Sequence, residues 1–115
     1  SSPDYNALTG SRFLTHPPRC TVDLHFEKPG HPIADGLCDF SIRDEHYAIE
    51  MLCQDADLFL TSRSKDGGVQ PAGYTRLLGE GRLCALTPGH TLDVWETPSF
   101  IRLLTNAFEW CLKER

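Results

Sequence analysis

The sequence predicts a mixed domain in which a β-sheet is closed by a C-terminal helix. Several short apolar or alternating segments, separated by glycine and proline, have the pattern of strands. Only the C-terminal segment has the periodicity of a long helix. A parallel sheet needs helices on both faces. The sequence therefore predicts either a mostly antiparallel α+β domain or part of an α/β domain that continues upstream of Ser1.

The composition excludes several classes of protein. The chain has 115 residues, of which 40% are hydrophobic, and this suits one folded domain. The formal net charge is −5 and no cluster of Lys and Arg occurs, so neither nucleic acid nor a membrane is an expected partner. The five cysteines include no C-x-x-C pair, which predicts reduced, structural thiols in a cytoplasmic protein. No cofactor is predicted.

Three extended segments are predicted in the first half of the chain: 21–27, 40–42 and 56–61. The first alternates between apolar and polar residues, which is typical of a strand with one face in water. The last is a short apolar run, which is typical of a buried strand. Residues 11–18 are predicted to form a loop, because two prolines exclude a helix there.

A hairpin and a polar loop are predicted next. The glycines at 79 and 81 mark the turn between strands at 71–78 and 82–87. The second strand contains an unbroken apolar run, so we expect it to be buried on both faces. It ends at Thr87-Pro88-Gly89-His90, and α/β proteins usually bind ligands at loops in this position.

The C-terminal helix is predicted to begin at Thr97 and Pro98, a good N-cap followed by a residue that suits the first helical position. Apolar residues recur at helical spacing on the face that should pack on the sheet: Phe100, Leu103, Leu104, Ala107, Phe108 and Cys111. The opposite face is expected to hold the polar residues Arg102, Asn106, Glu109 and Lys113.

A series of motifs resembles the ThuA-like (trehalose utilisation) family. In chain order these are His31-Pro-Ile-x-x-Gly-Leu-x-x-Phe40, Asp44-Glu-x-Tyr47, Gly79-Glu-Gly-Arg-Leu83, Gly89-His90, Trp95 and Pro98-x-Phe100. The family resembles the class I glutamine amidotransferase-like fold, an α/β flavodoxin-like three-layer sandwich. The resemblance implies that residues 1–115 form a single ThuA-like domain that is incomplete at the N-terminus and represents its C-terminal half.

The resemblance also implies bacterial carbohydrate utilisation, with trehalose, a related disaccharide or a keto-sugar as the small-molecule partner. Three functions remain open: an acid/base sugar-modifying enzyme, a non-catalytic sugar-binding or regulatory module, and a metal-dependent hydrolase built on histidines. The expected protein partner is the upstream half of the same domain or a second copy of the chain.

Glu45, Asp44 and His90 are the candidate catalytic residues. Neighbouring carboxylates in a partly dry cleft suit general acid/base catalysis, and histidine is the side chain that titrates near neutral pH. We expect the loop after the apolar strand to bring His90 to the same edge as Glu45. The alternatives are a solvated turn for the carboxylates and a loop-holding role for the histidine.

The candidate substrate-binding residues are Tyr47, Trp95, Gly89, Arg76 and His16. Tyr47 would hydrogen-bond a sugar hydroxyl, Trp95 would stack on a sugar ring, and Gly89 would let the backbone approach the ligand. Packing is the alternative role for both aromatic residues, and a surface ion pair is the alternative for Arg76. No metal site is predicted, since no pair among His16, His31, His46 and His90 has the spacing of a zinc motif.

Overall fold

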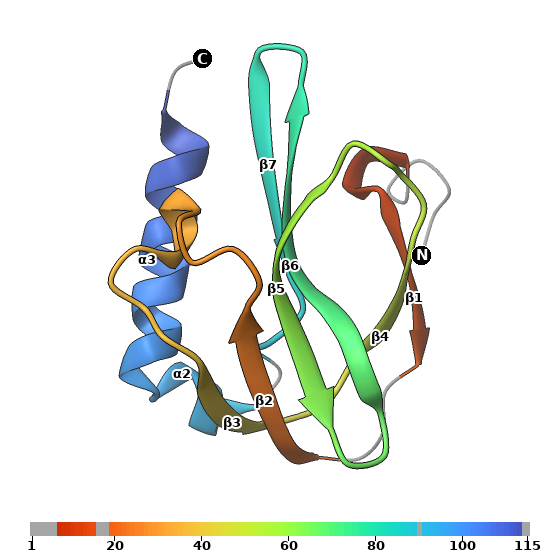
Figure 1. Ribbon diagram of the computed structural model, residues 1–115, viewed down its shortest axis with the longest axis vertical. Coiled ribbons are helices and arrows are strands. Elements are labelled where there is room, and N and C mark those ends of the chain that lie inside the picture. The colour runs from red at the N-terminus through yellow and green to blue at the C-terminus, as the bar shows by residue number, and fades with distance from the viewer. Residues whose placement is uncertain (1–6, 16–18, 90, 114–115) are drawn as a thin grey trace.

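The computed structural model describes residues 7–15, 19–89 and 91–113. Within these residues, five antiparallel strands form a curled main sheet (Figure 1). In sheet order the strands are β3 (Phe40–Asp44), β2 (Cys20–Phe26), β5 (Asp57–Ser64), β6 (Gly68–Leu78) and β7 (Gly81–Leu86). The protein is therefore a small mixed domain of sheet and helix, and the antiparallel pairing does not confirm the flavodoxin-like three-layer sandwich.

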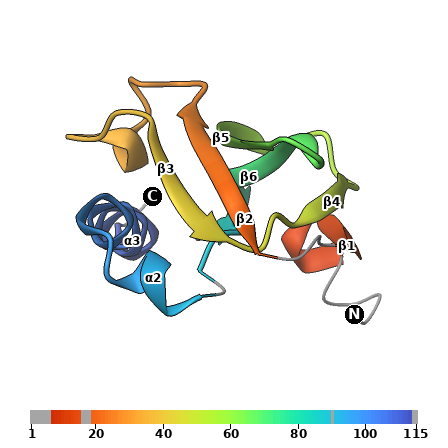
Figure 2. The same cartoon turned by 90° about the horizontal axis from the view of Figure 1, so that it is seen from below.

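A two-stranded ribbon and the helices lie beside opposite ends of this sheet (Figure 2). The ribbon pairs β1 (Ser11–Thr15) with β4 (Ala48–Met51). The helical elements are the 3-10 turn η1 (Pro32–Ala34), α2 (Leu92–Trp95) and α3 (Pro98–Leu112). No helix in the described ranges is long and apolar enough to cross a membrane.

The alternation predicted for residues 21–27 is confirmed. Val22, Leu24 and Phe26 of β2 are buried, and they pack in one core with apolar residues of η1, β5, α2 and α3. The intervening residues of β2 are exposed, because successive side chains of a strand point to opposite faces. One face of β2 therefore packs in the core with α3, whereas its other face is open.

The hairpin and the start of the long helix are also confirmed. Residues 78 and 81 pair across the β6–β7 turn, and Gly79 has a φ of +60°, which glycine adopts without strain. The helix α3 begins at Pro98 after Thr97, although the Thr97 hydroxyl donates to Asp93 O (3.0 Å) instead of capping the helix.

Two predictions of strand structure are wrong. Residues 11–15 form β1 rather than a loop, because their backbone pairs with β4, a strand that the sequence pattern did not reveal. The two prolines of that segment follow the strand and so do not interrupt it. Residues 83–86 of β7 are only half-buried, since β7 is the terminal strand of the sheet among the described residues.

The predicted faces of α3 are partly wrong. Asn106, assigned to the exposed face, is buried, and Phe108, assigned to the core, is 72% exposed. The cause is a pair of hydrogen bonds, because Asn106 Nδ2 donates to the carbonyls of Ile33 (3.0 Å) and Asp35 (2.8 Å). Trp110 is buried on the same side of the helix as Asn106. The face of α3 that packs on the core is therefore rotated about the helix axis relative to the apolar stripe seen in the sequence.

Candidate functional site

The end of β3 holds the loop that follows β7. Asp44, the last residue of β3, is 1% exposed, and its Oδ2 accepts a hydrogen bond from the Gly89 N–H (2.9 Å). Gly89 has a φ of +115°, a conformation that favours glycine. Asp44 therefore has a loop-holding contact, while its catalytic role stays a prediction.

A second bond fixes the other side of the same loop. Thr91 Oγ1 donates to the carbonyl of Arg43 at 2.7 Å. His90 lies outside the described residues. Its neighbours are bonded to the last two residues of β3: Gly89 to Asp44, and Thr91 to Arg43. The backbone on both sides of position 90 is thus held at the strand end that leads into Glu45.

Glu45 and Tyr47 follow β3 directly and interact with each other. Both side chains are half-buried. Burial raises the pKa of Tyr47 above its ordinary value, and the charge and hydrogen bond of Glu45 raise it further. Tyr47 therefore keeps its phenolic proton throughout the physiological pH range and can act as a hydrogen-bond donor.

Trp95 of α2 contacts the loop that follows β7. Its Nε1 donates to Gly89 O (3.0 Å), and its ring packs edge-on against Phe100 at a centroid distance of 5.3 Å. A Cβ at Gly89 would lie 3.2 Å from the Phe100 ring, so glycine also provides space here. Half of the Trp95 surface remains exposed, which leaves ring area available to a ligand. Residues 43–47 with Gly89, Thr91 and Trp95 are called the β3 rim below.

Arg76 lies away from the β3 rim. Its guanidinium forms two bonds with the Asp55 carboxylate (3.1 and 3.3 Å), and its Nη1 donates to the carbonyls of Ala7 (3.0 Å) and Leu8 (2.9 Å). The strand registers place Arg76 near the β6–β7 turn, at the opposite end of the sheet from Asp44. This geometry agrees with the ion-pair interpretation. His16 lies outside the described residues.

The described histidines do not form a metal centre. His46 is buried between Ser64 Oγ (2.5 Å from Nδ1) and Ser62 Oγ (2.9 Å from Nε2), and burial lowers its pKa. His31 stacks on Phe59 at a centroid distance of 4.8 Å. In the part of the chain that the structure describes, no three His, Cys, Asp or Glu side chains are placed to hold a metal ion.

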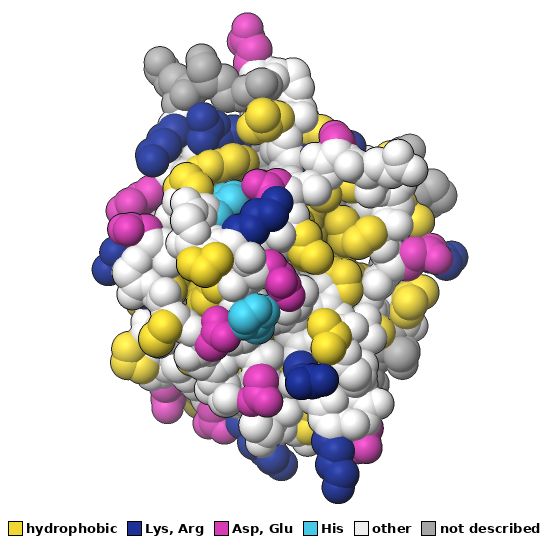
Figure 3. All heavy atoms as spheres, in the orientation of Figure 1, with side chains coloured by type: hydrophobic (Ala, Val, Ile, Leu, Met, Phe, Trp, Pro, Cys, Tyr) yellow, Lys and Arg dark blue, Asp and Glu magenta, His cyan; other side chains and the backbone are white. Residues whose placement is uncertain are grey.

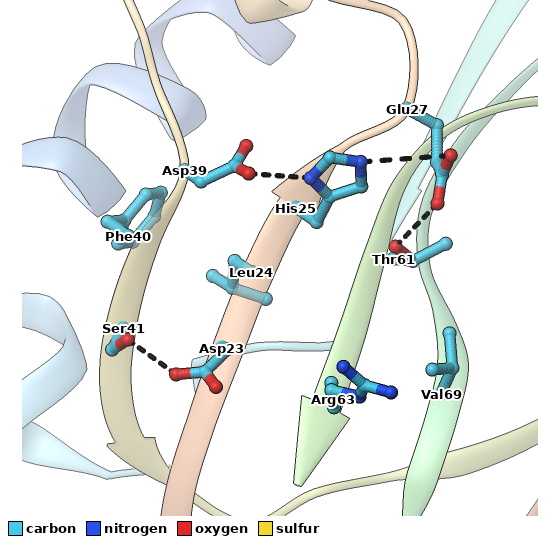
Figure 4. A pocket seen from close by; sticks show the side chains of 10 residues that line it. All are labelled: Asp23, Leu24, His25, Glu27, Asp39, Phe40, Ser41, Thr61, Arg63 and Val69. Atoms are coloured by element: carbon cyan, nitrogen blue, oxygen red, sulfur yellow. Dashed lines mark hydrogen bonds and ion pairs between the residues drawn. The ribbon is translucent and has the colours of Figure 1, made fainter.

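A polar groove on the open face of the sheet was missed by the sequence predictions. The groove has a volume of about 540 Å³ and lies over β2, β3 and β5 (Figure 4). On this face, acidic and basic side chains lie close to a histidine over the middle of the sheet (Figure 3). The sequence feature that could have revealed the groove is the alternation of residues 21–27, which places Asp23, His25 and Glu27 on one face. The sequence analysis predicted only that this face of the strand lies in water.

Three pairs of polar side chains connect the strands across this groove. Ser41 Oγ donates to Asp23 Oδ1 (2.6 Å), and Thr61 Oγ1 donates to Glu27 Oε1 (3.0 Å). The third pair is His25 Nδ1 with Asp39 Oδ2 (2.5 Å), and this hydrogen bond raises the pKa of His25. We call this surface the sheet groove.

A family model matches the sequence, and several solved structures have a similar fold. The ThuA family model, described as trehalose utilisation, matches residues 1–111. A ThuA-like protein from Bacteroides uniformis has a similar fold, with a TM-score of 0.80 and 21% identity, over 99% of this chain and 53% of that chain. A ThuA-like protein from Parabacteroides merdae has a TM-score of 0.65 and 21% identity, over 89% of this chain and 40% of that chain.

A cytoplasmic protein from Salmonella typhimurium is also similar, with a TM-score of 0.63 and 16% identity, over 92% of this chain and 44% of that chain. None of the curated proteins matches the sequence. The chain spans about half the length of the solved structures that it matches, and at these identities the likeness concerns the fold. Because the family model covers nearly the whole sequence, the chain belongs to the ThuA family.

Proposed function

We propose that the β3 rim forms part of an acid/base site for a neutral carbohydrate: trehalose, a related disaccharide or a keto-sugar. The observation that carries this proposal is the pair of bonds from Gly89 to Asp44 and from Thr91 to Arg43. These bonds hold Gly89 and Thr91, the residues on either side of position 90, at the strand end next to Glu45. The family description as trehalose utilisation supports the substrate class.

Each residue of the rim has a role in this proposal. Glu45 acts as the general base, which accepts a proton from the attacking water as the water oxygen bonds to the substrate carbon. His90 acts as the general acid, which donates a proton to the leaving oxygen as the bond between that oxygen and the carbon breaks. Tyr47, which remains protonated, donates a hydrogen bond to the sugar. Trp95 offers its exposed ring surface to the sugar, and its bond to Gly89 O fixes the ring orientation before the ligand binds.

The test is an assay of the purified protein with trehalose and 3-keto-trehalose. Glu45→Gln and His90→Ala should each reduce kcat by about 100-fold or more, because each removes a group that transfers a proton. Glu80→Gln is the matched control, since this exposed residue of the β6–β7 turn undergoes the same change far from the rim. Unchanged turnover in both rim variants would contradict the proposed roles.

A second candidate function is a non-catalytic sugar-binding module, and the sheet groove favours it. Its three side-chain pairs present carboxylate and hydroxyl oxygens at fixed positions, which suits the hydroxyls of a sugar. The groove contains Asp23, Glu27 and Asp39 but only Arg63 as a permanent cation, so it favours neutral sugars over sugar phosphates.

Isothermal calorimetry with trehalose distinguishes the two candidates. In the binding module, Asp23→Asn should weaken trehalose binding, whereas Glu45→Gln should leave it unchanged. Absence of sugar binding at millimolar concentration would contradict the module.

We place the protein in the bacterial cytoplasm in either case; the free state of its cysteines and the description of the Salmonella relative as cytoplasmic support this location.

We further propose that the complete domain is a flavodoxin-like three-layer sandwich, to which this chain contributes the C-terminal portion. The support is the coverage of the relatives, because nearly all of this chain matches about half of the Bacteroides uniformis protein.

A further inference from the structure

The outer edge of β7 presents backbone groups that β6 does not pair. The Thr87 N–H donates to Ala72 O (2.9 Å), and the register from residue 81 to residue 86 is continuous. Hydrogen-bonded and non-hydrogen-bonded pairs alternate along an antiparallel ladder. Residues 81, 83 and 85 therefore form the backbone hydrogen bonds to β6, whereas Arg82, Cys84 and Leu86 direct their N–H and C=O groups to the outer edge, where the Cys84 N–H bonds to the thiol of Cys111.

An apolar groove lies beside this edge, between β7 and α3. It has a volume of about 270 Å³, and every residue that lines it is uncharged: Cys84, Leu86, Leu104, Ala107, Phe108 and Cys111. Burial raises the pKa of Cys84 to about 12, so its thiol stays neutral. Phe108 is 72% exposed at the rim of the groove. The groove and the outer edge of β7 are together called the β7–α3 face.

Two elements depart from their sequence patterns at this one place. The apolar run of β7 is patterned for burial on both faces but is half-buried. In the apolar stripe of α3, Leu104 and Cys111 pack at the edge of the core, whereas Phe108 is 72% exposed. Half-buried apolar residues of β7 and α3 thus lie side by side with the exposed Phe108 at this groove.

We propose that the β7–α3 face docks the complementary part of a ThuA-like domain. An extended strand of that part pairs with the outward groups of residues 82, 84 and 86, and its apolar side chains fill the groove. This inference rests on the proposal that the chain is one portion of a larger domain, and it is independent of the sugar chemistry.

The size of the relatives favours this occupant over a second copy of the chain. The Bacteroides uniformis protein has nearly as much polypeptide again beyond the matched 53%. If a second copy paired antiparallel through its own β7, a two-fold axis perpendicular to the sheet would relate the two copies. The α3 helix of the second copy would then lie on the same face of the sheet as the first. The side chains of Leu83 and Ala85, which point to the opposite face, would stay half-exposed.

Hydrogen exchange followed by NMR tests the docking. The probe is the unmatched portion of the Bacteroides uniformis protein, produced as a separate polypeptide. In the 115-residue chain alone, the amides of Arg82 and Leu86 should exchange rapidly. Addition of the probe should slow them by about tenfold or more, because each gains a backbone partner. The amides of β3, the opposite edge of the same sheet, should not change.

Two variants identify the surface. Phe108→Asp should abolish the protection of β7, since it places a charge in the apolar groove. Leu92→Asp is the matched control, because Leu92 is also 72% exposed but lies on α2 outside the groove. Both variants should keep the far-ultraviolet circular dichroism of the parent chain.

Two results would overturn the proposal. The first is the absence of protection at β7 when the probe is added. The second is a β7 edge that is already protected in the chain alone through a discrete dimer, which would identify a second copy as the occupant. Neither result depends on turnover, so failure of the docking proposal is distinguishable from failure of the sugar proposal.

Discussion

The sheet groove and the β7–α3 face are both uncovered surfaces, but their chemistry is opposite. In the sheet groove, polar side chains form pairs across the strands, as His25 does with Asp39. In the β7–α3 face, the lining side chains carry no charge, and the adjacent strand edge presents backbone groups that β6 does not pair. The first surface can stay in water at little cost, whereas exposure of the second costs both apolar hydration and an open strand edge.

This difference explains why we assign a ligand to one surface and a polypeptide to the other. Paired carboxylates and hydroxyls recognise small polar molecules and need no cover. An apolar groove beside a free strand edge is the arrangement to which another strand adds. Exposure by itself therefore does not identify the function of a surface; the pairing of its polar groups does.

The largest effect should come from the inner side of α3. Leu103→Ala should lower the free energy of unfolding by about 2–5 kcal/mol, because Leu103 is fully buried and its truncation leaves a cavity. Phe108→Ala in the same isolated chain should change it by less than about 0.5 kcal/mol, since Phe108 is largely exposed. Urea unfolding measures the free energy of unfolding of both variants. If the two variants lost equal stability, the β7–α3 face would not be an open surface.

An intermediate effect is expected at the residue that sets the rotation of α3. Asn106→Ala should cost about 1–3 kcal/mol, because the carbonyls of Ile33 and Asp35 lose their donor. Thr105→Ala, on the exposed side of the same helix turn, is the control and should be nearly neutral. If the two variants were equally stable, the Asn106 bonds would not explain why Phe108 faces outward.

The smallest effect concerns the pairing of the sheet groove. The hydrogen bond to Asp39 raises the pKa of His25, so the protonated imidazole stabilises the fold. This contribution is fully present below the ordinary value of 6.5 and is lost as the pH rises through the raised pKa. In an NMR titration, Asp39→Asn should return the His25 pKa toward its ordinary value.

His46 provides the internal control for that titration. Its pKa is lowered by burial, and its ring is bonded to Ser62 and Ser64, so Asp39→Asn should not move it. An unchanged His25 titration in the variant would show that the groove side chains are not paired in solution.

The local elements were the most predictable part of the fold. The alternation of residues 21–27, the glycine turn before β7 and the Thr97-Pro98 helix start each depend on neighbours in the chain, and the structure confirms all three. The ribbon of β1 and β4 was not predictable, because neither strand has a clear pattern and each is defined by pairing with the other.

The arrangement of the candidate site was not predictable from the sequence. The motif series indicated the β3 end, yet the sequence did not reveal that the Asp44 carboxylate holds the Gly89 loop across a separation of 45 residues. Arg76 was placed in the site from its strand position, whereas the structure directs it to Asp55 and the N-terminal residues. Glu45, His90, Tyr47 and Trp95 stay predictions as functional residues.

The amino-acid sequence by itself determined the alternating strand β2, the β6–β7 turn, the start of α3 and the family that the chain resembles, because backbone preference and apolar spacing are properties of adjacent residues. Only the tertiary structure decided which face of α3 is buried, how three strands assemble the sheet groove, and where β7 stays open. Those features depend on hydrogen bonds and packing between residues that are distant in the chain, such as Asn106 with Ile33. Contacts of this kind have no signature in local sequence.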